Sequence, residues 1–463
     1  MRVSVAPIRP WFFAFLVSSL ALTGGCGSSD GAATSGSATS GSGVGGRSEA
    51  GERPVAEAHE LRAADGVGKA ITLSSSGPGG RGPHTFTITE FPRNGALDGD
   101  DGDAEVTYTA TAGFVGRDTF RFRVNDGVAD SDEATVTLRV QHFPGAAWES
   151  RAPAELGLDG AKLDELAARV GGVGSIVKDG YMVKTWGNQT AKADWGSARK
   201  PLLGTMLFFA VQEELIGGVG ERIEEWVQVA TSNELRPEDR DMTFWHLANM
   251  VSGYARAEAP GAAYAYNDYG TTLYGRLLEA IFGGPLDAPA RTRLTPLQLQ
   301  DGSLFTTRGG LGVSTSTRDF ARIGWLWLNH GNWHGEQILA EAFFEQHMSN
   351  QVPGSLPRSS AAGEDYLGVG STGGSSDQTP FGPGIFGMAW WFNDTVGTTS
   401  SLAWPGAPID TVHANGHFGR EMVVMISSLN IVVAARGDWG SFEPGDPDSG
   451  INRNFDLLAS AAR

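Results

Sequence analysis

The sequence contains almost no cysteine: Cys26 is the single one among 463 residues. One thiol excludes an internal disulfide framework and any zinc or iron–sulfur site built from cysteines. Positive charge is also scarce, with 35 Lys and Arg against 53 Asp and Glu and a formal net charge of −18. Nucleic-acid phosphates would repel such a chain, so we expect no DNA or RNA partner. Hydrophobic residues make up 40%, which is enough to bury a sizeable core in a multidomain chain.

Residues 1–26 have the pattern of an export signal. Arg2 and Arg9 precede an apolar stretch at residues 11–22 that is too short to span a bilayer comfortably, and small residues lead from it to Cys26. This resembles a bacterial lipoprotein box, whose cysteine is acylated, with Thr23 where the box usually has leucine. The alternative is an ordinary cleaved signal with an incidental cysteine. Both predict a protein outside the cytoplasm, either secreted or lipid-anchored to the cell envelope through Cys26.

Residues 27–58 begin with a stretch of Gly, Ser, Ala and Thr that has almost no large apolar side chain. Such a composition cannot bury enough surface to offset chain entropy, so we predict a flexible tether. A G-x-S-x-G match at residues 27–31 falls inside it. A nucleophile elbow requires a strand before the serine and a helix after it, and the tether predicts neither.

Residues 59–142 alternate apolar and polar side chains with period two at 85–89, 105–109, 119–124 and 134–140. Turn sequences separate these segments, which predicts a β-sandwich. Residues 106–127 resemble the bacterial Ig-like or cadherin-like modules of surface proteins. The acidic turns between the strands favour plain turn chemistry over calcium binding, because they lack the ligand spacing of an EF-hand loop.

Residues 146–463 mix helical and strand patterns. Helices are predicted at 156–170, 202–211 and 454–462, and the middle one is apolar nearly all round, as a buried helix would be. A hairpin is predicted at 174–186 with its turn at Asp179-Gly180, and two more strands at 423–426 and 431–435. We therefore expect an α/β (α+β) domain with an antiparallel sheet flanked by helices.

Two Ser-x-x-Lys matches are candidates for a serine nucleophile activated by an amine. Ser175 and Lys178 lie on a predicted strand, where residues three apart point to opposite faces. Ser197 and Lys200 lie where the buried helix begins, and helical spacing places them on one face. Because serine and lysine are common, the four-residue pattern alone favours an N-capping serine beside a surface lysine.

Further segments accompany Ser197 in a characteristic order, at residues 243–254, 264–270, 309–324 and 413–420. Together they resemble the penicillin-recognising serine hydrolases, and most of all the class C β-lactamase-related branch of esterases, D-amino-acid peptidases and 6-aminohexanoate-dimer hydrolases. The resemblance extends over about residues 150–460. It implies a β-lactamase/DD-peptidase-like domain after the Ig-like sandwich.

The resemblance also implies roles for single residues. Ser197 would be the nucleophile and Lys200 its activating partner. Tyr266 would relay protons as the first residue of the family's Tyr-x-Asn motif, with Asp268 in this chain where asparagine is usual. Tyr264 is the rival tyrosine, and its fit is weaker because Tyr266 would then replace the asparagine.

The third family motif, Lys-Thr-Gly or His-x-Gly, fits His417-Phe418-Gly419. Gly419 would let substrate approach a strand edge, and the backbone N–H of Arg420 would form an oxyanion hole with that of Ser197. His413 and His417 do not form a metal pair, because a strand or turn lacks the helical geometry of residues four apart.

The resemblance implies an extracytoplasmic serine hydrolase that cleaves a small-molecule ester or amide, or a peptide, through an acyl-enzyme. No metal or organic cofactor is required. We identify no counterpart of the deacylating glutamate of class A β-lactamases, so efficient β-lactam hydrolysis is not expected. Two alternatives stay open: a catalytically silent surface-binding or adhesion protein, and a cell-wall D-alanyl-D-alanine carboxypeptidase.

Overall fold

The computed structural model describes residues 53–77, 83–99, 102–302, 304–306, 312–371 and 373–462. All of them belong to one compact unit that spans residues 51–463. The predicted signal, its Cys26 and the tether up to residue 52 lie outside the described residues. None of the helices in the described ranges combines the length and hydropathy needed to cross a membrane.

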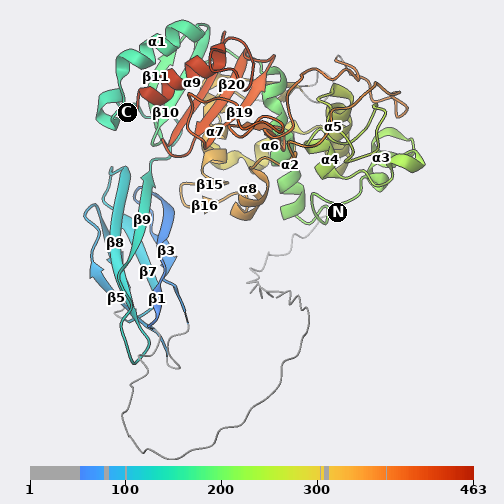
Figure 1. Ribbon diagram of the computed structural model, residues 1–463. Helices are drawn as coiled ribbons and strands as arrows, with labels where there is room; N and C mark the ends of the chain where they lie inside the picture. The colour runs from blue at the N-terminus through green and yellow to red at the C-terminus, as the bar shows by residue number, and fades with distance from the viewer. Residues whose placement is uncertain are drawn as a thin grey trace, which may run out of the picture. The chain divides into compact units, whose positions relative to one another are not determined.

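The first part of the described chain is a β-sandwich, as its period-two patterns predict (Figure 1). One sheet has the strand order β2-β9-β8-β5, with β2 parallel to β9, and the other has the order β3-β7-β6. The strands are β1 (Val55–Ala56), β2 (His59–Ala64), β3 (Lys69–Thr72), β4 (Ser75–Ser76), β5 (Thr85–Glu90), β6 (Gly95–Asp98), β7 (Glu105–Ala110), β8 (Gly116–Asn125) and β9 (Ala134–Gln141).

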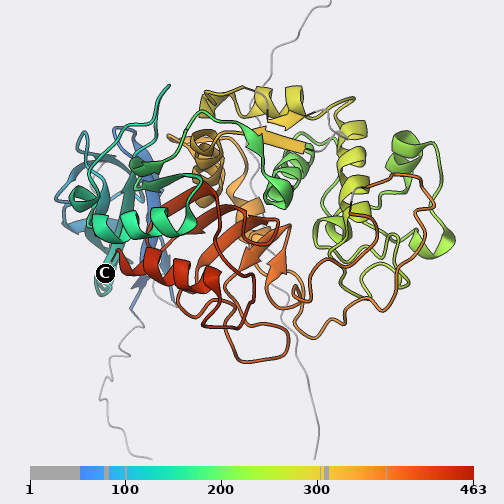
Figure 2. The same ribbon diagram turned by 90° about the horizontal axis from the view of Figure 1, so that it is seen from above.

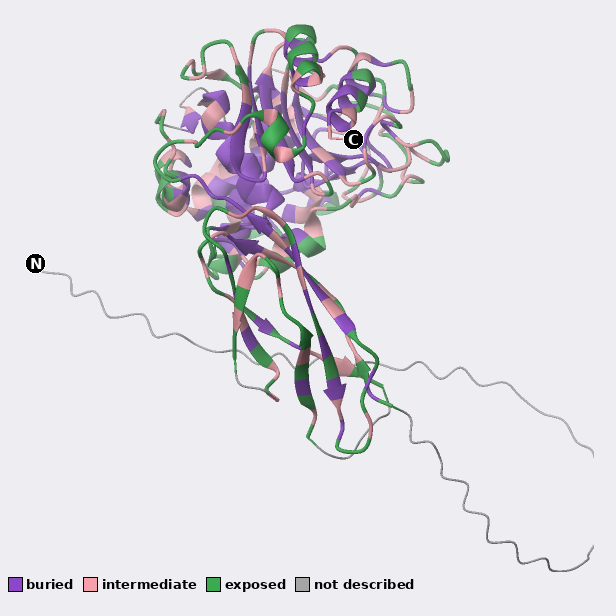
Figure 3. Ribbon diagram, turned by 90° about the vertical axis from the view of Figure 1, so that its left-hand side faces the viewer, coloured by how far each residue is buried: buried purple, intermediate pink, exposed green. Residues whose placement is uncertain are grey.

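Burial alternates along these strands, as the striped ribbons in Figure 3 show. The apolar side chains of one face, among them Phe120, Phe122 and Val124 on β8, are fully buried between the two sheets. The Tyr108 hydroxyl donates a 3.0 Å hydrogen bond to the buried Asp118 carboxylate, so these two polar groups are paired inside the core.

A seven-stranded antiparallel sheet forms the centre of the second part, in the order β11-β10-β21-β20-β19-β18-β17. The predicted hairpin at its edge is confirmed, with Asp179 and Gly180 at φ 53° and 90° as a tight turn of this kind requires. The strands are β10 (Val173–Lys178), β11 (Tyr181–Trp186), β17 (Phe386–Gly387), β18 (Trp390–Phe392), β19 (Thr411–Gly416), β20 (Glu421–Ile426) and β21 (Ile431–Arg436). Three smaller strands, β12 (Ala193–Asp194), β13 (Phe305–Thr306) and β14 (Gly312–Thr315), form a separate sheet, and β15 (Asn332–Trp333) pairs with β16 (Glu336–Gln337).

Helices cover both faces of this sheet. One face packs against the neighbouring helices α1 and α9, drawn green and red in Figure 2, and the other against α7 and the buried helix α2. Helix α5 packs against α2, α3 and α4 and so joins a helical region to the sheet. The helices are α1 (Gly160–Val170), α2 (Lys200–Gln212), α3 (Glu224–Thr231), α4 (Phe244–Ala248), α5 (Asp268–Ile281), α6 (Asp287–Arg293), α7 (Thr317–Leu328), α8 (Glu341–His347) and α9 (Gly450–Ser460).

The predicted fold class is thus confirmed, with two helix boundaries corrected. Helix α1 starts four residues later than predicted, because Gly157 takes a left-handed conformation (φ 71°) and ends a separate 3-10 turn, η1 (Pro153–Leu156). Helix α9 starts four residues earlier than predicted, because the Ser449 side chain accepts the backbone N–H of Asn452 as an N-cap.

Candidate active site

Ser197 lies in a 3-10 turn, η2 (Gly196–Arg199), that leads directly into α2. The preceding Gly196 has φ 49°, a left-handed conformation that favours glycine, and a Cβ there would lie 2.7 Å from the His417 ring. The buried Trp195 anchors the turn, because its indole N–H donates to the Thr315 carbonyl at 2.9 Å. As a first-turn residue, Ser197 has a backbone N–H with no acceptor inside its own helix.

Lys200 follows one turn later as the first residue of α2, and its side chain is only 2% exposed. Its Nζ donates to Asp268 Oδ1 at 3.2 Å and lies 3.9 Å from the centre of the Tyr266 ring. A buried ammonium is tolerated only when it is paired, and this one has a carboxylate and an aromatic face as partners. The alternative of an N-capping serine beside a surface lysine is therefore wrong, because Lys200 is buried.

The structure thus brings Tyr266 and Asp268 to Lys200 from a segment almost seventy residues further along the chain. Asp268 opens helix α5, and the Asn267 side chain caps that helix by accepting the Gly270 N–H at 2.8 Å. Capping fixes the direction in which the chain enters α5 and, with it, the position of the Asp268 carboxylate. The Tyr266 ring packs against Trp391 and Phe418, at ring-centre distances of 5.9 and 6.0 Å.

Asp268 is held as a carboxylate. Burial acts to raise its pKa, but the charge of Lys200 and the hydrogen bonds from Gln378 and Lys200 outweigh burial, so that the pKa is lowered. The pair therefore carries one negative and one positive charge at neutral pH. A neutral asparagine at this position would leave the lysine amine without a counter-ion.

A loop segment from Gly373 to Gln378 runs across this tyrosine motif and bonds to its backbone. The Asp377 carboxylate accepts the Tyr266 N–H at 3.0 Å, and the Gln378 N–H donates to the Tyr266 carbonyl at 3.0 Å. The Asp377 side chain is 8% exposed and forms an ion pair with Arg358. Sequence reasoning missed this strap, because no motif marks it.

The third motif is placed differently from the expectation. His417, Phe418, Gly419 and Arg420 form the turn between β19 and β20, and the first two have φ of 43° and 50°. The Arg420 N–H donates to the Gly416 carbonyl at 3.0 Å within this turn. It is therefore already bonded, and the expectation that it pairs with the Ser197 N–H in an oxyanion hole is corrected.

Gly416, rather than Gly419, is the glycine that lies against η2, the turn that contains Ser197 and is called the serine turn below. A Cβ on Gly416 would lie 2.4 Å from the Trp195 carbonyl oxygen, whereas a Cβ on Gly419 would meet the carbonyl of Gly440 at 2.5 Å. The expected role of Gly419 in admitting substrate is corrected accordingly. His417 lies at the serine turn and its Nδ1 is 2.9 Å from Glu421 Oε2.

Two other candidates lie apart from this group of residues. Tyr264 is fully buried against Phe386, and burial raises its pKa well above the usual value. His413 is buried as well, and burial lowers its pKa to about 3, so it is neutral at pH 7. Within the described residues, no group of three metal-binding side chains converges.

The second Ser-x-x-Lys match lies on strand β10, as predicted. The Ser175 hydroxyl donates to Gln189 Oε1 at 2.5 Å, while Lys178 forms an ion pair with the neighbouring Asp179. The two side chains thus have separate partners, and this pair offers no nucleophile with an adjacent amine.

Comparison with known proteins finds a similarity for the first part of the chain. Residues 52–139 match the family model described as Bacterial Ig domain. The sandwich is thus similar to bacterial Ig domains. No curated protein matches the chain.

Solved structures align with the second part. A family VIII carboxylesterase is 13% identical, with 67% of this chain and 98% of that chain covered and a TM-score of 0.47. A β-lactamase from Mycobacterium bovis is 16% identical, with 65% and 100% covered and a TM-score of 0.44. The D-amino acid amidase from Ochrobactrum anthropi SV3, complexed with L-phenylalanine amide, is 14% identical, with 66% and 97% covered and a TM-score of 0.42.

Proposed function

We propose that the chain is a serine hydrolase that cleaves a small ester or amide through an acyl-enzyme on Ser197. The observation that carries this proposal is the environment of Lys200. Its amine, one turn from Ser197, is buried between the Asp268 carboxylate and the Tyr266 ring. Two of the sequence segments that resemble the penicillin-recognising hydrolases therefore meet at one lysine.

In its reactive form the Lys200–Tyr266 pair has first released one proton to water. In the acylation step, Ser197 Oγ attacks the substrate carbonyl carbon while its proton passes to this deprotonated pair. The free N–H of Ser197 stabilises the oxyanion of the tetrahedral intermediate. When the C–O or C–N bond to the leaving group breaks, Tyr266 returns the proton to the departing oxygen or nitrogen.

In the deacylation step, water attacks the ester carbonyl on Ser197. The same pair accepts a proton from this water and returns it to Ser197 Oγ as the acid product leaves. Every proton in the cycle is therefore exchanged between substrate, water and side chains of this chain.

We place this activity outside the cytoplasm. The export signal at residues 1–26, with acylation of Cys26, would anchor the protein to the cell envelope through the linker that follows. The match of residues 52–139 to a bacterial Ig domain supports display at a surface.

Active-site labelling tests the proposal. After brief exposure to a fluorophosphonate, mass spectrometry should find one adduct, on the peptide that contains Ser197, and none in the Ser197→Ala variant. Ser175→Ala is the matched control and should label like the wild type. Absence of any adduct would instead favour the catalytically silent binding protein.

Substrate assays then separate the remaining alternatives. We expect release of p-nitrophenol from short acyl esters, with the same dependence on Ser197 as the labelling. Release of D-alanine from a muropeptide without ester hydrolysis would replace the proposal by a D-alanyl-D-alanine carboxypeptidase.

A further inference from the structure

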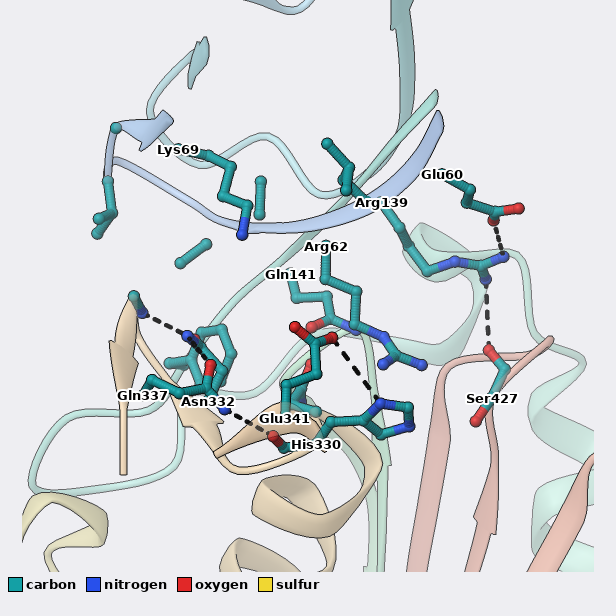
Figure 4. A pocket seen from close by; sticks show the side chains of 18 of the residues that line it. Glu60, Arg62, Lys69, Arg139, Gln141, His330, Asn332, Gln337, Glu341 and Ser427 are labelled. Atoms are coloured by element: carbon teal, nitrogen blue, oxygen red, sulfur yellow. Dashed lines mark hydrogen bonds and ion pairs between the residues drawn. The ribbon is translucent and has the colours of Figure 1, made fainter. Parts of the chain in front are cut away.

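A cavity of about 420 Å³ lies away from the Ser197 site. Strands β2, β3 and β9 supply part of its wall, and a segment from Asn329 to Glu345 supplies another part (Figure 4). Its lining includes none of Ser197, Lys200 or Tyr266. The volume is within the range of small-molecule sites.

Three cationic side chains line this cavity, and they differ in their partners. Arg139 forms an ion pair with Glu60 at 3.3 Å and donates to the Ser428 carbonyl at 3.1 Å. The side chains of Arg62 and Lys69, by contrast, form no hydrogen bond and no ion pair with any residue that the structure describes. Two cations of the lining thus lack a partner.

Arg62 is the more costly of the two to leave unpaired. Burial lowers the pKa of its guanidinium, and the like charge of Arg139 acts in the same direction. His330 adds no charge at pH 7, because burial and the neighbouring Arg62 lower its pKa to about 4. The charges of Glu341 and Glu60 act to raise the pKa of Arg62, but neither carboxylate forms an ion pair with it. A partly buried guanidinium with no carboxylate in bonding distance costs free energy, and a bound anion would lower that cost.

We infer that this cavity binds a small organic anion, with a carboxylate or phosphate group on Arg62 and Lys69. A guanidinium can bind either group with two parallel hydrogen bonds, and the lysine adds a flexible donor. Glu341 and Glu345 of α8 line the same cavity. Their charges disfavour a large polyanion and so limit the ligand to one that stays close to Arg62. This site does not depend on the proposed hydrolase activity.

Isothermal titration calorimetry on the full chain tests the inference, with inorganic phosphate and malonate as probes and sodium chloride at equal ionic strength as the blank. We expect saturable one-site binding of at least one probe. Arg62→Met keeps the side-chain volume and should weaken binding at least about tenfold, since it removes charge-assisted hydrogen bonds. Arg93→Gln, at an exposed arginine outside the cavity, is the matched control and should bind like the wild type.

Each outcome of the titration decides the question. Binding of phosphate alone identifies a phosphoryl ligand, and binding of malonate alone identifies a carboxylate ligand. Absence of saturable binding of both probes, or equal weakening in Arg62→Met and Arg93→Gln, overturns the inference. Should Arg62→Met lose its native circular dichroism, Lys69→Met, at a partly exposed side chain, provides the same test.

Discussion

Replacing Asp268 by asparagine tests the pairing at the centre of the candidate site. The change keeps the size and one hydrogen-bond acceptor but removes the charge that faces Lys200. At the observed 3.2 Å, the Coulomb attraction of the two unit charges is about 5 kcal/mol for an effective dielectric constant of 20. The retained hydrogen bond offsets about 1–2 kcal/mol, so we expect Asp268→Asn to lose about 3 kcal/mol of stability at pH 7.

Thermal unfolding measures this loss. Each kcal/mol of lost stability lowers the melting temperature by about 2 °C, so a loss of about 3 kcal/mol should lower it by about 6 °C. Asp164→Asn is the matched control, because Asp164 is 66% exposed in its ion pair with Lys184, and such exposed pairs contribute about 0–1 kcal/mol. Equal shifts in the two variants would show that the buried pair contributes no more than a surface pair.

The pH dependence provides a second test. The pKa of Asp268 is lowered in the folded chain, so its contribution to stability is complete above the pKa of the unfolded chain, about 3.9. It is lost as the pH falls through the lower folded-state value. The difference in melting temperature between wild type and Asp268→Asn should therefore be constant from pH 8 to pH 5 and shrink below about pH 4. A difference that grows in acid would refute the reasoning.

Three further substitutions test the site. Ser197→Ala should abolish acyl-enzyme formation, seen by mass spectrometry, and leave the circular dichroism spectrum unchanged, since the hydroxyl is not part of the core. Tyr266→Phe should lower kcat about 10²–10⁴-fold, because it removes only the proton-transferring hydroxyl, whereas Tyr264→Phe should stay within about tenfold of wild type; the reverse order would assign the relay to Tyr264. Gly416→Ala should slow labelling by fluorophosphonate at least about tenfold, because its Cβ would displace the backbone of the serine turn, while Gly145→Ala, which meets no atom within 4 Å, should label at the wild-type rate.

Sequence patterns predicted correctly those elements of the fold that depend on interactions between residues close together in the chain. The strands of the sandwich and the hairpin at Asp179-Gly180 follow from period-two alternation and turn chemistry, which act within a few residues. The helix boundaries were less accurate, because a left-handed Gly157 and a capping Ser449 move them by four residues. Each of these boundaries depends on the conformation or the hydrogen bond of a single residue, which hydrophobic periodicity does not show.

The candidate site divides in the same way. The spacing of Ser197 and Lys200 is local, and the resemblance to a family supplied Tyr266 and Asp268. The sequence pointed to Gly419 and not to Gly416, because the glycine that lies beside the serine depends on where β19 ends and its turn begins. Asp377 carries no motif at all, since its importance comes from a tertiary hydrogen bond to the backbone of Tyr266.

The charges around the serine turn also bear on the substrate. Lys200 is paired with Asp268, and His417 lies against Glu421 at 2.9 Å. Arg420 points to Asp438 at 3.3 Å. The cationic side chains of Lys200 and Arg420 thus each already lie against a carboxylate, and the His417 ring lies against a third. A substrate that ends in a free carboxylate would have to displace one of these carboxylates and accept its repulsion. A neutral acyl ester or amide meets no such penalty, because its reacting carbonyl requires only N–H donors. We therefore expect kcat/KM for an uncharged p-nitrophenyl ester to exceed that for the same acyl group carrying a terminal carboxylate, and the difference to narrow in Glu421→Gln.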